Sequence, residues 1–376
     1  MRYLRTLSTR SLAVLVVAVL ALVVGGAAIA VAAGRGNSPT PPPKPLAEAL
    51  HDSLAAPDIP GLTARIRFTN HLFPSGSLVG ANLSTLLSGA SGRLWLTNDG
   101  RGRLELQSDA GDAQIMWNDG EVTVYDASAN TVYKLKLPSS SSPATDKGPA
   151  PSVAEINDFL TKLGEQADVS AARPTDVGGR PAYSVKISPK HDGGLLGYAE
   201  LAWDAAHSVP LRIGIYAQGS SSPVLQLAAT NVSYGSVPSA DVTITPPPGV
   251  KTVDLGAPSG GKPEAPATKP DFDVVAPDSL VGLPRKDMRA IGNGGELIVY
   301  GQDLGAIVVV EHKAQSGTQG NSILSALPTV ALDGLTGHEL ATQLGTAIQW
   351  TRNGVSYVLV GSLPPAAAES AARALK

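Results

Sequence analysis

The residue types that could carry out chemistry are present in this chain, but not in catalytic or metal-binding patterns. Its six histidines are scattered along the sequence: His51, His71, His191, His207, His312 and His338. None of them has a second histidine, or an acidic pair, at the spacing of metal ligands on a helix. No serine stands in a G-x-S-x-G motif, and the glycines of residues 292–295 are too few for a phosphate-binding loop. The chain also lacks cysteine, so thiolate sites and disulfides are excluded. We therefore expect no catalytic residues, no metal, no cofactor and no enzymatic activity.

The bulk composition excludes a further class of partner. The chain has 376 residues, with 29 basic against 32 acidic ones and a net charge of -3. A nucleic-acid-binding protein would need a concentrated basic face, so we expect no nucleic acid as partner. The 40 glycines and 30 prolines favour a β-rich fold with many turns over a helical bundle.

The N-terminal segment predicts export from the cytoplasm. Three arginines precede an uncharged run of residues 11–34, mostly Ala, Val and Leu. As a helix this run would reach about 36 Å, enough to cross a hydrocarbon core of about 30 Å. The arginines should stay on the cytoplasmic side, which places the bulk of the chain outside. Residues 1–34 are then either a membrane anchor or a signal peptide cleaved near the small residues 28–32. We expect a single-pass protein of the cell membrane, or a secreted one, with residues 35–45 as a proline-rich spacer.

A first outer domain is predicted over residues 46–255. It opens with a helix over residues 46–54, and a capping box formed by Ser152 and Glu155 starts another over 153–163. Period-two alternation, with turn residues such as Asp119 and Gly120 between segments, predicts an antiparallel meander followed by further strands. These strands are expected over residues 62–68, 93–97, 103–107, 113–117, 122–125, 131–137, 182–188, 197–203, 211–217 and 224–234.

A proline- and glycine-rich linker over residues 256–270 separates a second, smaller domain over residues 271–376. Strands are expected over 296–300 and 306–312, with the β-branched run 307–310 as a central buried strand. Residues 339–345 read as a turn into a strand over 346–352. Asn353 and Gly354 then predict a hairpin into 355–361. Ser362 is expected to cap a last helix that runs to Leu375.

Several motifs of the first domain resemble a known family. Residues 118–120, 124–126 and 132–137 are similar in order and spacing to the signature of LolA-like lipoprotein-carrier domains. Residues 179–183, 203–204 and 209–212, with the closing 248–250, extend the resemblance over about 46–255. It implies a curved antiparallel half-barrel, with helices across its concave face and an acyl chain or lipid held between them.

The second domain resembles that of the two-domain MucB/RseB-type envelope regulators. Residues 347–350, 353–354, 357–361 and 363–365 carry this resemblance. It implies an α+β module that follows the LolA-like domain and restrains an anti-sigma factor outside the membrane. The fold class is therefore predicted to be α+β, a half-barrel with helices followed by a small α+β domain.

The resemblance points to an apolar pocket on one face of the half-barrel. The parity of the strands selects the candidate pocket residues: Leu62, Ile66, Phe68, Leu94, Leu96, Leu104, Leu106, Ile115, Trp117, Val122, Val124, Ile213 and Ile215. The predicted partners are a lipid or lipoprotein acyl chain in this pocket, a membrane protein or anti-sigma factor at the second domain, and the membrane itself through residues 11–34. The chain would act as a carrier or as an envelope sensor. The alternative is that the same residues fill a closed core, in a structural or protein-binding envelope module without a ligand.

Overall fold

The structure is a computed structural model that describes residues 40–72, 89–109, 111–118, 120–136, 150–207, 209–254, 268–314 and 327–376. The predicted membrane segment 11–34 lies outside these residues, as do residues 35–39 of the spacer and residues 256–267 of the linker. Within the described part, no helix combines the length and the apolar character needed to span a membrane.

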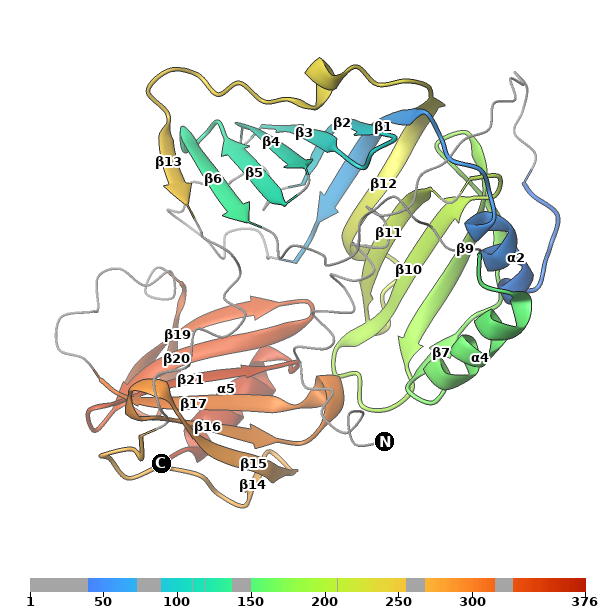
Figure 1. Ribbon diagram of the computed structural model, residues 1–376. Coiled ribbons are helices and arrows are strands. Elements are labelled where there is room, and N and C mark those ends of the chain that lie inside the picture. Colours follow the sequence, from blue (N-terminus) through green and yellow to red (C-terminus); the bar gives the residue numbers. More distant parts are fainter. Residues whose placement is uncertain are drawn as a thin grey trace.

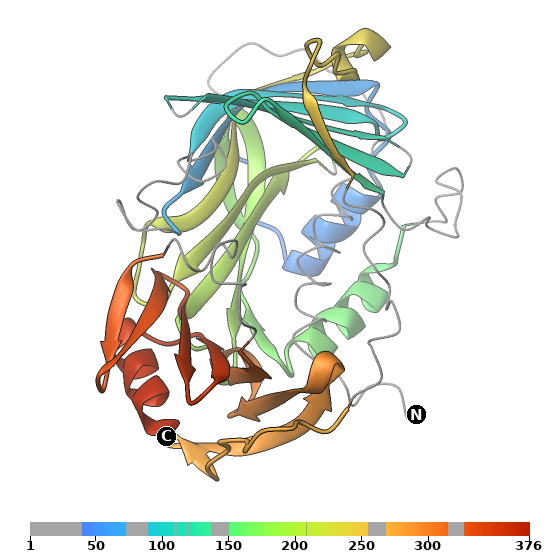
Figure 2. The same cartoon turned by 90° about the vertical axis from the view of Figure 1, so that its left-hand side faces the viewer.

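The first sheet is a curled half-barrel of 13 strands (Figure 1, Figure 2). Its strands are β1 (Gly61–Asn70), β2 (Ala90–Thr97), β3 (Gly102–Ser108), β4 (Gly111–Asn118), β5 (Glu121–Asp126), β6 (Thr131–Lys136), β7 (Ala167–Val169), β8 (Arg173–Val177), β9 (Arg180–Pro189), β10 (Leu196–Asp204), β11 (Pro210–Ala217), β12 (Pro223–Tyr234) and β13 (Lys251–Asp254). Their order is β13-β6-β5-β4-β3-β2-β1-β12-β11-β10-β9-β7, with β8 beside β9. The meander from β1 to β6 confirms the sequence prediction. Pairing is antiparallel throughout except for β13, which runs parallel to β6 at the edge.

Two helices lie beside the β7, β9 and β10 end of this sheet (Figure 1). Helix α2 (Leu46–Leu54) and helix α4 (Val153–Leu163) have the predicted bounds. The predicted capping box is present, because the Ser152 hydroxyl accepts from the Glu155 amide at 3.3 Å and the Glu155 carboxylate accepts from the Ser152 amide at 2.8 Å.

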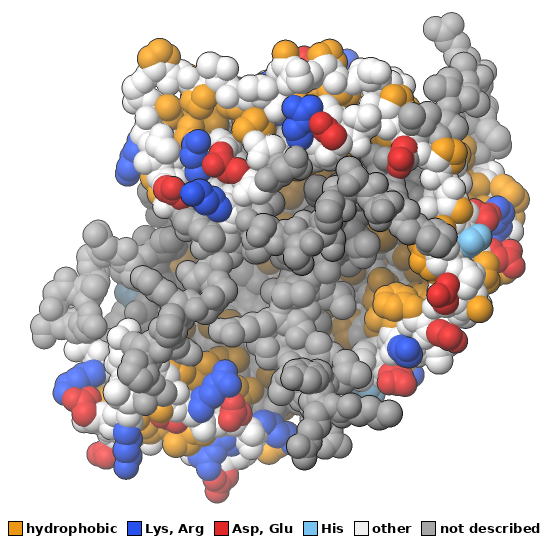
Figure 3. Space-filling view, in the orientation of Figure 1, with side chains coloured by type: hydrophobic (Ala, Val, Ile, Leu, Met, Phe, Trp, Pro, Cys, Tyr) orange, Lys and Arg blue, Asp and Glu red, His pale blue; other side chains and the backbone are white. Residues whose placement is uncertain are grey.

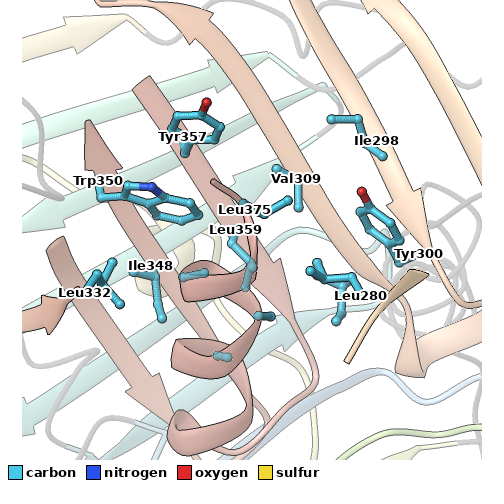
Figure 4. Packing of buried hydrophobic residues seen from close by; sticks show 14 of the residues in the cluster. Leu280, Ile298, Tyr300, Val309, Leu332, Ile348, Trp350, Tyr357, Leu359 and Leu375 are labelled. Atoms are coloured by element: carbon cyan, nitrogen blue, oxygen red, sulfur yellow. The ribbon is translucent and has the colours of Figure 1, made fainter. Parts of the chain in front are cut away.

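The second sheet has eight strands in the order β14-β15-β16-β17-β21-β20-β19-β18. They are β14 (Ser279–Leu280), β15 (Leu283–Ile291), β16 (Gly295–Tyr300), β17 (Ile307–Lys313), β18 (Thr329–Leu332), β19 (Leu335–Thr342), β20 (Gly345–Arg352) and β21 (Val355–Gly361). Helix α5 (Pro365–Ala374) packs on β20 and β21 over a core in which the Trp350 and Tyr357 rings stack at 5.0 Å (Figure 4). Strand β17 is central, as predicted, and the α+β fold class is confirmed.

Two local predictions for the second domain were wrong. Residues 339–342 belong to strand β19, because the turns on either side are short: Asp333 and Gly334 reverse the chain with φ of 49° and 86°, and Thr342 pairs directly with Gly345. The residue preceding helix α5 is Pro364, which offers no side-chain cap, so Ser362 does not cap it.

Ser362 instead takes part in a contact between the two sheets. Its hydroxyl accepts from the Leu195 amide at 2.8 Å and donates to the Leu344 carbonyl at 2.8 Å. Beside it the Gly305 amide donates to the Asp192 carbonyl at 3.2 Å. The turn between β9 and β10 thus docks directly on the second sheet.

Replacing Ser362 with alanine should loosen this contact while leaving both sheets folded. One hydrogen bond is lost on each side of the hydroxyl, and a net loss of about 1 kcal/mol would speed exchange of the Leu195 amide about fivefold. Hydrogen exchange of the full chain measures this, with Ser370→Ala on the exposed face of α5 as the control. Equal exchange in the two variants would mean that the serine does not hold the contact.

Candidate ligand-binding face

The predicted pocket residues on β1 to β5 share one face of the half-barrel. Cross-strand partners in an antiparallel sheet point to the same side. The registers pair Leu62 with Leu96, Leu94 with Leu104, and Leu104 with Ile115. They continue to β5, where Ile115 pairs with Val124 and Trp117 with Val122. Ile66 and Leu106 join the same face, because both pair with Gly92.

The same face continues through β12 and β11 to the helices. Phe68 and Ile213 both pair with Leu227, and Ile215 pairs with Leu225. Ile213 in turn pairs with Leu201 of β10, which packs in one cluster with Ala49 of α2. Helix α2 therefore packs on the β9–β10 end of this same face. The structure brings the whole predicted set onto one surface, and no observation tests whether that surface binds a ligand.

This face is only partly buried. Leu62, Ile66 and Leu106 are 3%, 4% and 2% exposed and act as core residues. The remaining predicted residues are half-buried: Phe68, Leu94, Leu96, Leu104, Ile115, Trp117, Val122, Val124, Ile213 and Ile215. A closed, filled core accounts for the first group. The second group forms an apolar strip that stays accessible.

The helices add apolar surface of their own. Phe159 of α4 and Leu54 at the end of α2 are 62% and 50% exposed. Hydrophobic side chains are visible on the surface over this helical part of the molecule (Figure 3).

Trp117 has a structural role in addition to its place on the face. Its indole nitrogen donates to the Gly100 carbonyl at 3.0 Å. The ring lies over Gly102, where an added Cβ would come within 2.1 Å of it. Trp117 therefore fastens the β4 end to β3, and its replacement would disturb the fold as well as the surface.

Some residues of the face were missed by the sequence analysis. Tyr133 and Leu135 of β6 pair with Val124 and Val122, and Leu225 and Leu227 extend the face on β12. Both strands had been predicted, so the period-two pattern could have found these residues.

A hollow of about 410 Å³ opens at the ends of β1, β2 and β3. Phe68 is the one predicted pocket residue that lines it, and its other lining groups are mainly polar, including Asn70, His71 and Asp109. Groups of this kind suit a polar headgroup better than an acyl chain. The apolar face defined by the strand registers is the better candidate for an acyl chain.

A buried polar cluster lies elsewhere, around Asp204 at the end of β10. Its carboxylate is 1% exposed and accepts from Arg180 Nε at 3.0 Å, the Tyr234 hydroxyl at 2.7 Å and the His207 ring at 3.0 Å, besides the Ala206 and His207 amides. Burial alone would raise the pKa of Asp204, but these donors outweigh it and lower the pKa to about 2. The carboxylate is thus fully occupied by structural hydrogen bonds. In the described residues, no three His, Cys, Asp or Glu side chains come together to hold a metal ion.

Solved structures of MucB and of a LolA superfamily protein are similar to this chain. The MucA/MucB complex of Pseudomonas aeruginosa shares 17% identity over 87% of this chain and 94% of that chain, with a TM-score of 0.42. A second structure, of MucB in complex with MucA(peri), shares 16% identity over 88% of this chain and 96% of that chain, also at 0.42. A LolA superfamily protein from Nitrosomonas europaea shares 9% identity over 54% of this chain and 98% of that chain, at 0.23. No family model and no curated protein matches the chain.

Proposed function

We propose that this chain is an exported, non-enzymatic protein that binds the acyl chain of a lipid or lipoprotein on the apolar face of its half-barrel. The observation that carries the proposal is the half-buried strip that runs without interruption across β2 to β5, with Leu94, Leu104, Ile115 and Val124 in register. A protein with a closed core would bury these side chains fully.

The energy available on such a face suits an acyl chain. Each methylene removed from water contributes about 0.8 kcal/mol, so a chain of about 14 carbons supplies about 11 kcal/mol before ordering costs. No charged group is needed for this binding. Residues 1–34 would keep the protein at the cell membrane as a single-pass anchor, or release it as a cleaved signal peptide.

The second sheet is the part of the chain to which we assign a regulatory role. A pure carrier needs only the half-barrel, whereas this chain adds an eight-stranded sheet in direct contact with the β9–β10 turn. We assign to that sheet a membrane-protein partner, such as an anti-sigma factor, that responds to occupancy of the acyl face. The two MucB structures are complexes of that protein with MucA, and the partner proposed for this chain is of that kind.

Native mass spectrometry of the full chain purified from its own host in a mild detergent tests the proposal. A mass excess that disappears on organic extraction, together with a recovered lipid, is the expected result. A bare polypeptide mass and no uptake of added lipids would instead favour a ligand-free module that binds only proteins.

A pair of variants on one strand tests the face itself. Ile115→Gln places a polar group on the apolar strip, and Met116→Gln places the same group on the opposite face of β4, where Met116 pairs with Thr123. Both residues are half-buried. We expect Ile115→Gln to weaken binding of a fluorescent fatty acid about tenfold, because a buried amide without a partner costs about 1–3 kcal/mol. Met116→Gln should bind like the wild type, and equal binding by the two variants would refute the assignment of this face.

A further inference from the structure

The outer face of β1 and β2 carries a group of arginines that the acyl-binding face does not use. Arg65 of β1 stands directly opposite Arg93 of β2 in the antiparallel register. Arg67, two residues along β1, lies on the same side and pairs with Ser91. All three arginines are exposed. Like charges placed directly opposite on a sheet repel each other, so this arrangement favours a negatively charged partner between them.

The neighbouring carboxylate does not neutralise this group. Glu105 is the acidic residue on the same face of β1 to β3, and it pairs in register with Arg93. Its side chain is already in an ion pair with Arg103, which also donates to Gln114 at 3.3 Å. In the described part of the chain, no carboxylate forms an ion pair with Arg65, Arg67 or Arg93. Three guanidinium groups therefore remain uncompensated on one exposed surface.

An indole ring holds part of this surface in place. The Arg93 and Arg103 guanidinium carbons lie 5.4 and 5.5 Å from the centre of the Trp95 ring. This cation–π contact orients the planar groups. A planar guanidinium can hold two oxygens of a phosphate at once, which a lysine ammonium cannot do as well.

We propose that this arginine surface, made of Arg65, Arg67 and Arg93, docks on the phosphate headgroups of an anionic phospholipid membrane. A protein partner would need an apolar anchor on the same surface. Trp95 cannot serve as one, because two arginines lie over its ring and the segment that carries Thr243 crosses it, accepting from Arg103 at 3.2 Å. What remains exposed is a group of positive charges, which matches a layer of phosphates.

The chain before the half-barrel keeps the half-barrel close to the bilayer. Residues 35–39 lie between the predicted membrane segment and the described chain, and five residues reach at most about 18 Å. Residues 40–45 already lie on the half-barrel, where Pro41 is buried and the Pro42 carbonyl accepts from the Tyr183 hydroxyl at 2.7 Å. In this respect the inference rests on the membrane anchor of the proposed function. It is independent of acyl binding.

The absence of cysteine from the chain makes a direct test simple. Asn231 is exposed and pairs with Arg65, so Asn231→Cys places one label beside the arginine surface. The labelled full chain is reconstituted into vesicles of phosphatidylcholine alone or with phosphatidylglycerol, and quenching by a headgroup-attached quencher is measured. We expect quenching in the anionic vesicles only, and loss of it as salt rises from about 0.05 to about 0.5 M.

Matched variants separate this surface from general charge effects. Arg65→Gln with Arg93→Gln should reduce the docked population about fivefold for each arginine removed. Arg173→Gln with Lys251→Gln removes the same charge from exposed positions on β8 and β13 and should leave docking unchanged. Equal quenching in the two double variants, or equal quenching in neutral vesicles, would overturn the proposal. The proposal would also be overturned if the double variant of Arg65 and Arg93 lost binding to polyglutamate but still docked on anionic vesicles. The partner of this surface would then be an acidic polypeptide.

Two further measurements on the same preparation distinguish docking of the arginine surface from acyl binding and from membrane anchoring. Uptake of a fluorescent fatty acid reports on the acyl face alone. Sedimentation with neutral vesicles reports on the membrane anchor alone. If the chain does not sediment with neutral vesicles, docking of the arginine surface is measured by sedimentation with anionic vesicles. Salt-sensitive docking without fatty-acid uptake would sustain the arginine surface and refute acyl binding, and the reverse result would refute only the arginine surface.

Discussion

Replacing Asp204 with alanine should lower the free energy of unfolding of the half-barrel by about 2–4 kcal/mol, because it leaves the partly buried Arg180 charge and the Tyr234 hydroxyl without their hydrogen-bond partner. The carboxylate holds Arg180, Tyr234 and His207, which come from β9, β12 and the turn after β10. Its removal leaves the Arg180 guanidinium and the Tyr234 hydroxyl without this acceptor. The same guanidinium lies over the Tyr234 ring, 4.7 Å from its centre. Urea unfolding of the full chain measures the loss, and hydrogen exchange should place it in β9 and β10.

Asp168→Ala is the matched control, since Asp168 is an exposed aspartate on the neighbouring strand β7. It should change the free energy of unfolding by less than about 0.5 kcal/mol. The wild type should also lose stability in acid. A carboxylate whose pKa is lowered to about 2 stabilises the fold above its unfolded value near 3.8, and that contribution disappears as the pH falls through 2. A loss no larger than that of the control would show that the cluster around Asp204 does not stabilise the half-barrel.

Glu311→Gln should have the opposite sign and make the second sheet more stable at alkaline pH. Glu311 is 0% exposed, and its neighbour in the register, Glu296, is 5% exposed. One carboxylate oxygen accepts from the Val275 amide at 3.1 Å, and the other has no partner among the described residues. Burial raises the pKa of Glu311 to about 7; the Val275 amide opposes this shift and Glu296 adds to it.

The sign follows from the folded state's preference for the proton. Because the folded pKa lies above the unfolded value of 4.5, the free energy of unfolding falls as the pH rises from about 4.5 to about 7 and then levels off. Glutamine mimics the neutral acid at every pH. We therefore expect Glu311→Gln to match the wild type near pH 4.5 and to exceed it by about 2 kcal/mol at pH 8.

Hydrogen exchange of peptides from β16, β17 and β21 at the two pH values, corrected for the intrinsic pH dependence of exchange, measures this difference within the full chain. Glu165→Gln, an exposed glutamate after α4, is the control and should show no difference between the two pH values. If the Glu311 variant were equally stabilised, or equally destabilised, at both pH values, the ionisation of this residue would not be the cause.

Most of the half-barrel could be predicted because its strands alternate cleanly. On β1 the residues Leu62, Ala64 and Ile66 are buried while Arg65 and Arg67 are exposed, and this parity placed the whole predicted set on one face. A register error of one residue would have inverted every assignment. The helix over 153–163 was equally readable, because Ser152 and Glu155 satisfy each other locally.

The elements that escaped prediction depend on distant partners or lack an apolar pattern. Strand β15 is mostly exposed and holds Pro284, Arg285 and Lys286, so it has no alternation to read. Strand β13 is four residues long and exists because β6 offers a free edge. Ser362 looked like a helix cap, but a tertiary partner, the Leu195 amide, takes its hydroxyl instead. The arginine surface was likewise invisible, because only the register shows that Arg65 faces Arg93.

The parallel pairing of β13 with β6 also determines where the chain leaves the half-barrel. After β12 the chain crosses the outside of the sheet and returns to its far edge, where Lys251 to Asp254 are bonded to Thr131 to Lys134 (Figure 1). The chain therefore departs toward the second sheet from the edge strand that travels furthest when the curved sheet widens. Two other contacts join the sheets: the β9–β10 turn lies near the opposite edge, and the Gln343 side-chain amide donates to the His71 carbonyl at the end of the central strand β1 at 3.1 Å. A ligand that spreads the half-barrel would lengthen the span between β13 and the β9–β10 turn, and the second sheet would bear that strain.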